Sequence, residues 1–239
     1  MPKCLIACEM SGRVRTQFAK RGWDAWSADL LPDEFYLWND GGYLENSRHY
    51  QGDVLDIISE DWDLVIAHPP CTDLSQAGAR YWKQKQADGR QRRAVDFFMK
   101  LYRMPRPEAY VVVENPVGFI PQVFREPDQT VEPWWFGDPL SKKTCLWYRP
   151  ADFSRPHEVS RLLDHLPLLL PDRIVEPTGR VTTGGGSWKT DKARGKTGMN
   201  NWEDSQGRAR RHILRSLTPG GFARACAEQF GSYIESRAA

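Results

Sequence analysis

Two stretches decide the fold: residues 64–71 read LVIAHPPC, and residues 110–116 read YVVVENP. Each begins with a short apolar run rich in β-branched residues, which is typical of a buried strand in a parallel sheet. Polar residues follow at once, so Cys71 and Glu114 lie just past the carboxyl ends of two strands. Open α/β sheets bind their ligands at that edge. The sequence therefore predicts a thiol and a carboxylate at one ligand-binding edge.

Strands and helices alternate around these two stretches. Strands are expected over 3–7, 24–28, 63–67, 109–113 and 145–148, with a further one ending near 51–54, and helices over 13–21 and 83–103. The alternation predicts a doubly wound, Rossmann-like α/β fold. Along the chain we expect an α/β domain (1–148), a small, loop-rich basic region (149–211) and a C-terminal helix that packs back on the first domain (212–239).

Composition indicates a soluble globular protein: 40% of the 239 residues are hydrophobic and 27% are charged. No apolar run approaches the ~18 residues that a membrane span needs. The amino terminus leads straight into a strand without a signal peptide, so we expect a cytoplasmic location and no membrane contact. The five cysteines are scattered and form no Cys-x-x-Cys pair, which argues against a disulfide framework or a metal site.

The net charge of +2 is unevenly distributed. Residues 180–215 contain nine basic and three acidic side chains, so that segment carries +6 and the rest of the chain −4. A local positive charge on a nearly neutral chain indicates contact with a polyanion at one place. The alternative is a solvated, flexible loop.

The turn after the first strand, ACEMSG at 7–12, indicates a cradle for a small polar ligand. It lacks Gly-x-Gly-x-x-Gly, so a dinucleotide is disfavoured. Asp29 follows the second strand, about 20 residues after the turn, where an acid can accept the ribose hydroxyls of a nucleoside. Asp53 ends the third strand, where an acid could bind an adenine amino group. Each acid alone could be a cap or a surface charge, but together they favour an adenosine-containing cofactor.

Two groups point to covalent chemistry. Prolines 69 and 70 stiffen the chain before Cys71, and the polar loop 71–75 predicts an accessible thiol suited to nucleophilic catalysis. A small buried hydrophobe is the alternative for a lone cysteine. In a pocket, Glu114 is expected to have a raised pKa and to donate a proton. The alternative is a capping or ion-paired glutamate.

The order of these motifs resembles the DNA cytosine-5 methyltransferase family, and most closely its short phage and prophage members. There, a Pro-Cys motif carries the nucleophile and a Glu-Asn motif binds the base. The resemblance implies that Cys71 attacks the pyrimidine, that Glu114 holds cytosine N3 and the exocyclic amine, and that the basic motif Lys142, Lys143 and Thr144 supports the flipped base. It covers roughly residues 3–148 and, more weakly, 212–230.

The resemblance also implies S-adenosyl-L-methionine as the cofactor, a Rossmann-like S-adenosylmethionine-dependent methyltransferase fold, and target recognition by residues 149–211. The implied cofactor site consists of Cys8, Glu9, Met10, Ser11, Gly12, Asp29, Leu30, Asp53, Val54, His68, Pro69 and Pro70. Three features depart from the family. The first turn is not Phe-Gly-rich, Pro116 replaces a common valine after Glu-Asn, and a large separate recognition domain has no room.

Double-stranded DNA is the implied partner, and a monomer is favoured. The basic residues expected to hold its phosphates are Arg80, Lys83, Arg92, Lys189, Arg194, Lys196, Arg208, Arg210 and Arg211, with Lys85, Arg90 and Arg93 as further candidates. Two alternatives stay open. One is a pyrimidine C5-modifying enzyme that uses a modified sulfonium donor or acts on RNA or a free nucleotide. The other is a non-catalytic DNA-binding module.

Overall fold

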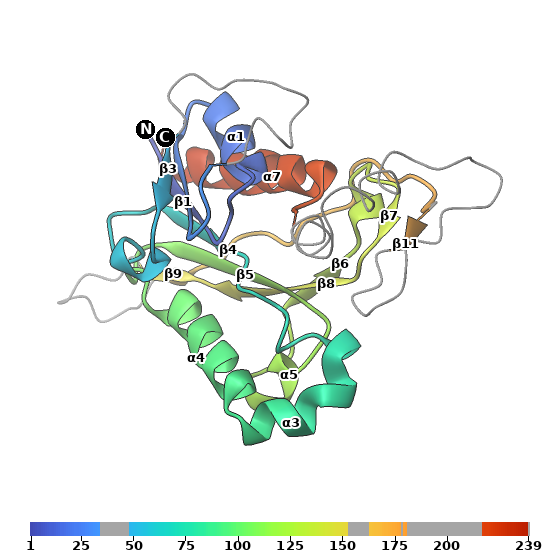
Figure 1. Cartoon of the computed structure of the whole chain (residues 1–239). Coiled ribbons are helices and arrows are strands. Elements are labelled where there is room, and N and C mark those ends of the chain that lie inside the picture. The colour runs from blue at the N-terminus through green and yellow to red at the C-terminus, as the bar shows by residue number, and fades with distance from the viewer. Residues whose placement is uncertain (34–47, 153–162, 178, 181–216, 239) are drawn as a thin grey trace.

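A computed structural model describes residues 1–33, 48–152, 163–177, 179–180 and 217–238 of the chain. One mixed sheet runs through the centre of the molecule. Helices α1 (Arg13–Lys20) and α7 (Gly220–Ala238) cover one face, and α3 (Trp82–Ala87), α4 (Arg90–Arg103) and α5 (Ile120–Val123) lie on the other side (Figure 1). The predicted doubly wound α/β fold is confirmed.

The central sheet has seven strands in the order β3-β2-β1-β4-β5-β8-β6. Their bounds are β1 (Lys3–Ala7), β2 (Asp24–Asp29), β3 (His49–Gln51), β4 (Leu64–Ala67), β5 (Tyr110–Pro116), β6 (Gln129–Val131) and β8 (Thr144–Arg149). Strands β1 to β5 pair in parallel, whereas β8 runs antiparallel to both β5 and β6. The winding direction reverses between β1 and β4, which is where such sheets form a crevice for ligands.

The apolar strand residues build a core on each face of the sheet, because successive side chains of a strand point to opposite sides. Tyr110 and Val112 of β5 belong to the cluster that includes Phe18 of α1 and Phe230 of α7. Val111 and Val113 belong to the cluster with Phe98 of α4. Burial on both sides explains why the run is continuously apolar rather than alternating.

Helix α7 lies beside α1, although the two are far apart in the sequence (Figure 1). Glu235 accepts hydrogen bonds from Arg21 Nη2 at 2.6 Å and from Trp23 Nε1 at 2.6 Å. Near the end of the helix, Asp164 accepts hydrogen bonds from Tyr233 at 2.7 Å and from Arg237 Nε at 2.8 Å. These contacts fix the direction of α7, so its first turn reaches the carboxyl edge of the sheet.

The single helix expected over 83–103 is wrong, because the structure has two. Helix α3 ends before Gly89, whose φ of 75° lies in the left-handed region that glycine adopts most readily. Asp88 Oδ1 then accepts the backbone N–H of Arg90 at 3.0 Å and starts α4. The apolar face expected for 94, 97, 98 and 101 belongs to α4 alone.

The remaining elements are short. The 3₁₀ helices are η1 (Val54–Asp56), η2 (Gln76–Tyr81) and η3 (Pro133–Trp135). Strand β7 (Leu140–Ser141) pairs in parallel with β11 (Gly179–Arg180), and β9 (Ala151–Asp152) pairs antiparallel with β10 (Leu163–Asp164). Within the described ranges, no helix combines the length and the apolar character needed to cross a bilayer.

Candidate active site

The register of the parallel strands assembles the site. Ala7 is opposite both Ala28 and Ala67, and Ala67 is opposite Val113. The residues that come next along these four strands are Cys8, Asp29, His68 and Glu114. They therefore follow one another along the carboxyl edge of the sheet, and the edge divides into an acidic part at β1–β3 and a part at β4–β5 that carries the two motifs.

The two motifs are joined residue by residue. His68 Nδ1 lies 3.2 Å from Glu114 Oε2, and Asn115 Nδ2 donates to the Pro69 carbonyl oxygen at 3.0 Å. Both contacts are buried or partly buried, so they fix the chain after β4 against the end of β5. The sequence placed His68 and Pro69 in the cofactor site. The structure instead turns the His68 side chain towards Glu114.

Glu114 has a lowered pKa, contrary to the expectation. Burial acts to raise the pKa of this carboxyl, but hydrogen bonds from His68 and Thr144 and the positive charge of Lys142 together outweigh it. The side chain is therefore an ionised carboxylate at neutral pH, which accepts hydrogen bonds rather than donating a proton. Local motifs could not reveal this, because the three partners come from other strands.

The basic motif reaches the same edge because β8 runs antiparallel to β5. Thr144, at the start of β8, is opposite Pro116, at the end of β5. Lys142 and Thr144 line the pocket beside Glu114, and Thr144 Oγ1 donates to the Lys142 carbonyl oxygen at 3.0 Å. Lys143 is exposed and does not line the pocket.

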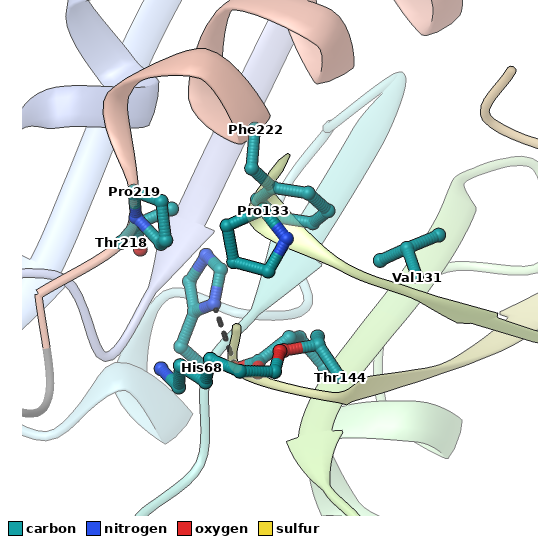
Figure 2. Close-up of a pocket in the computed structure, with 9 residues that line it drawn as sticks. His68, Val131, Pro133, Thr144, Thr218, Pro219 and Phe222 are labelled. Carbon is teal, nitrogen blue, oxygen red and sulfur yellow. Dashed lines mark hydrogen bonds and ion pairs between the residues drawn. The ribbon is translucent and has the colours of Figure 1, made fainter. Parts of the chain in front are cut away.

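The pocket beside Glu114 has a polar floor and an apolar roof (Figure 2). Its lining consists of His68, Glu114, Lys142, Thr144, Val131, Pro133, Thr218, Pro219 and Phe222. Its free volume is about 10 Å³, roughly the space of one water molecule. A pyrimidine ring can enter only if part of the wall moves outwards. The sequence placed Thr218 and Pro219 only within the C-terminal helical segment 212–239, since nothing local indicates that α7 begins at this pocket.

Cys71 opens a tightly bonded loop. Its carbonyl oxygen accepts the backbone N–H groups of Leu74 at 3.0 Å and Ser75 at 2.9 Å. Lys85 Nζ donates to the Thr72 carbonyl oxygen and lies 3.1 Å from Asp73 Oδ1. The Lys85 side chain is only 7% exposed, so it supports this loop. It is therefore not available to a phosphate, although the sequence had suggested such a contact.

The Cys71 thiol is half-buried and responds to charges from both motifs. Burial raises its pKa most, the carboxylate of Glu114 raises it further, and the charges of Lys142 and Lys85 lower it; the net pKa is raised. The thiol expected to be freely accessible is thus partly shielded. It lies close enough to Glu114 and Lys142 for both to act on it, although Cys71 does not line the small pocket.

A close backbone approach couples the Cys71 loop to the end of β5. Phe119 N–H donates to the Leu74 carbonyl oxygen at 2.8 Å, and Gln76 N–H donates to that of Val117 at 2.9 Å. Between them, a Cβ atom on Gly118 would lie 2.0 Å from the Leu74 carbonyl oxygen. Only glycine allows the two segments to come this close.

The β1–β3 part of the edge carries the expected acids. Asp29 Oδ1 accepts the Leu31 backbone N–H at 2.9 Å, and Asp53 Oδ1 accepts that of Leu55 at 3.0 Å. Both carboxylates act on Cys8, whose pKa is raised by burial first and then by these two charges. Leu30 is 73% exposed beside Asp29. This part of the edge therefore offers two acids and an uncovered apolar side chain.

Glu9 has a structural partner that the sequence did not reveal. Its buried carboxylate accepts the backbone N–H groups of Val14 at 2.7 Å and Arg15 at 3.3 Å, at the start of α1. Gly12 has a φ of 62° immediately before this helix. The N-terminus of α1, where such folds bind phosphate, is thus already occupied by a carboxylate of the chain itself.

The other residues assigned to the cofactor differ in exposure. Met10, Ser11, Val54 and Pro69 are buried, whereas Pro70 is exposed. Pro70 and Thr72, on either side of Cys71, line a shallow groove of about 220 Å³. Arg90, Arg93 and Phe97 of α4 line it from the other side. No group of His, Cys, Asp and Glu residues in the described part of the chain could hold a metal ion.

The basic residues assigned to DNA fall into two sets. Arg80, Lys83 and Arg92 are exposed on η2, α3 and α4. The Arg80 guanidinium lies over the Tyr81 ring at 4.6 Å. The second set, Lys189, Arg194, Lys196, Arg208, Arg210 and Arg211, lies outside the described residues.

No protein-family model and no curated protein sequence matches this chain. Among solved structures, it is similar to an RNA methyltransferase from Salinibacter ruber in complex with S-adenosyl-L-homocysteine, with 15% identity over 66% of this chain and 86% of that one and a TM-score of 0.34. It is also similar to the glycopeptide N-methyltransferase MtfA complexed with S-adenosyl-L-methionine, with 13% identity over 72% and 71% and a TM-score of 0.31. Likenesses this distant carry no argument, so the fold rests on the strand order above.

Proposed function

We propose that the chain is an S-adenosylmethionine-dependent methyltransferase that modifies C5 of a flipped cytosine in DNA through a covalent Cys71 adduct. One observation carries the proposal: the half-buried Cys71 thiol lies within the electrostatic reach of both the Glu114 carboxylate and the Lys142 ammonium. Cys71 provides a nucleophile, Glu114 a hydrogen-bond acceptor and Lys142 a positive charge. Together they suit the addition of a thiolate to a polar ring.

The residues at the β1–β3 edge fit the cofactor. The carboxylates of Asp29 and Asp53 suit a ribose and an adenine amino group, and the exposed Leu30 offers an apolar surface for a ring. Because Glu9 already caps α1, a pyrophosphate would meet a carboxylate there, whereas a cationic sulfonium ligand would be attracted. When bound, S-adenosylmethionine supplies an electrophilic methyl group.

The chain's own residues prepare the base. Cys71, as thiolate, adds to C6 and shifts an electron pair towards C5 and N3, which makes C5 nucleophilic. Lys142 stabilises the negative charge that develops on the ring, and ionised Glu114 accepts a hydrogen bond from the exocyclic amino group of the base. After C5 is methylated, its hydrogen is lost as a proton to a solvent water or hydroxide, the C–H electron pair re-forms the C5–C6 double bond, and the C6–S bond breaks to release Cys71 as thiolate.

A polymer substrate is supported by the ends of the basic segment. Arg180, which precedes residues 181–216, pairs with Ser141, the neighbour of Lys142. Leu217 and Thr218 follow the same residues, and Thr218 lines the pocket. The segment that contains most of the excess positive charge is therefore attached at both ends beside the pocket. A phosphate backbone held there would present a base for flipping.

Methyl transfer from tritiated S-adenosylmethionine tests the proposal, with unmethylated genomic DNA, RNA and dCMP as parallel acceptors. We expect label in DNA only, with bisulfite sequencing placing it on cytosine. Cys71→Ser should abolish transfer but retain DNA binding, whereas Cys226→Ser, which changes a buried core thiol of α7, controls for a general loss of fold. Because Glu114 also acts on Cys226, Cys4→Ser at the buried start of β1 is a second control that Glu114 does not act on. Full activity of Cys71→Ser would refute the covalent route, and label in RNA or dCMP would change the substrate class.

A further inference from the structure

One polar atom in the pocket is left without a partner. The His68 side chain is only 9% exposed, and its Nδ1 atom is engaged by Glu114. Its Nε2 atom is buried and has no hydrogen-bond partner among the described residues. The ring stands between Pro133 and the Thr218–Pro219 turn in the pocket wall (Figure 2). Since an unsatisfied buried polar atom is costly, this one indicates a ligand or a water that completes it.

The contact with Glu114 decides what Nε2 can do. An ionised carboxylate only accepts hydrogen bonds, and the lowered pKa of Glu114 keeps it ionised. The Nδ1 atom must therefore carry the proton of this contact. In the neutral imidazole, the other ring nitrogen is then an acceptor with a lone pair that faces the pocket.

We propose that His68 Nε2 accepts a hydrogen bond from the exocyclic amino group of the pyrimidine in this pocket, which makes His68 a specificity-determining residue. The substrate class rests on the function proposed above. Cytosine presents an amino donor at C4, and uracil or thymine presents a carbonyl oxygen there. That oxygen would face the Nε2 lone pair and leave both atoms unpaired, so the site would select aminopyrimidines.

Glu114 and Lys142 complete this assignment. With Oε2 on His68 Nδ1, Glu114 is the group that orients the imidazole, and Lys142 and Thr144 also act on this carboxylate. Lys142 also lines the pocket, and its ammonium can donate a hydrogen bond to a ring acceptor such as a carbonyl oxygen. The pocket wall thus offers both an acceptor and a donor, which are the partners that the amino and carbonyl groups of cytosine require.

Two matched variants distinguish this role from a purely structural one, in which His68 only holds Glu114 in place. The amide of His68→Asn can replace Nδ1 and keep the Glu114 contact, but leaves the Nε2 position vacant. His68→Gln carries an amide oxygen to the Nε2 position, but gives up Nδ1. We expect His68→Asn to lower kcat/KM for methyl transfer to unmethylated DNA by about tenfold to a hundredfold, and His68→Gln to retain more activity. The reverse order would overturn the proposal.

A second measurement needs no methyl transfer. Nitrogen-15 NMR of the histidine rings in the full chain, assigned with His68→Asn, reports which ring nitrogen carries the proton. We expect Nε2 to be unprotonated at pH 8, and its signal to move on addition of millimolar dCMP but not of dUMP. A protonated Nε2, an equal response to both nucleotides, or no response to dCMP would overturn the proposal. If this selectivity holds but no acceptor is methylated, the proposed function fails while the recognition of the amino group stands.

Discussion

Opposing effects set the pKa of the Cys71 thiol. Burial protects the thiol from solvent but raises its pKa, and two lysines partly offset that rise. Lys142 is the larger of the two favourable charges, and it also lines the pocket with Glu114. The reactivity of this cysteine is therefore set by a residue from a different strand pair rather than by its own loop.

Replacing Lys142 tests this control of the thiol. The positive charge of Lys142 lowers the pKa of Cys71, so Lys142→Met should raise that pKa and move the pH midpoint of iodoacetamide alkylation upwards. At neutral pH, Cys71 in this variant should react several-fold more slowly, as peptide mass spectrometry can measure. Lys143→Met is the matched control, because Lys143 is exposed and acts on Cys145 instead. An unchanged midpoint in Lys142→Met would contradict this assignment.

For single residues, the sequence predicted which side chains lie at the strand ends, but it did not predict their charge states. Cys71 and Glu114 could be placed at strand ends because apolar runs stop directly before them. The lowered pKa of Glu114, the buried ion pair of Lys85 and the capping role of Glu9 depend on partners from other elements. Local patterns do not contain such partners.

The elements of the site are coupled through Gly118. The loop after Cys71 and the segment after β5 exchange backbone hydrogen bonds on both sides of this residue. A shift of the end of β5 is therefore transmitted to the Cys71 loop without passing through any side chain. The stiffness of the site depends on this contact as much as on the two prolines.

Gly118→Ala should separate these two segments. A Cβ atom placed 2.0 Å from a backbone oxygen forces the backbone to shift, so we expect a loss of about 1–3 kcal/mol in the free energy of unfolding. Urea denaturation measures the loss, and faster alkylation of Cys71 would report the opened loop. Gly220→Ala is the control, since its added Cβ would meet its nearest atom at 3.9 Å. Equal stability of both variants would rule out a tight approach.

Most strands could be predicted because a short, continuous apolar run bounded by polar residues is typical of a buried strand. The break between α3 and α4 was missed, although the dipeptide Asp88-Gly89 is typical of a turn. The positive φ of Gly89 separates the two helices, and Asp88 accepts the backbone N–H of Arg90, the first residue of α4.

For the whole molecule, the arginine-lined groove beside Cys71 extends the site towards solvent. The double variant Arg90→Ala/Arg93→Ala should weaken DNA binding and reduce the magnitude of the slope of log K against log salt by about two, since each lost phosphate contact removes about one unit. Fluorescence anisotropy at several salt concentrations measures both effects. Arg106→Ala is the control, because Arg106 pairs with Asp61 near the opposite edge of the sheet. An unaltered slope would place the phosphates elsewhere.

The overall architecture followed from the alternation of strands and helices, but the pocket did not. Its roof comes from Pro133 and from Pro219 and Phe222 at the start of α7, which reach Glu114 only because α7 packs beside α1. Such packing over a long sequence separation leaves no periodic signal. The fold class was therefore predictable from one sequence, whereas the shape of the cavity was not.

The residues that flank 181–216 on either side are each bound to another part of the described chain. Arg180 is fixed by its pairing with Ser141, and Thr218 is fixed by a hydrogen bond from Arg13 to its carbonyl oxygen at 2.9 Å. Both contacts lie outside residues 181–216, so we expect a replacement of that segment to leave the sheet, Cys71 and Glu114 in place.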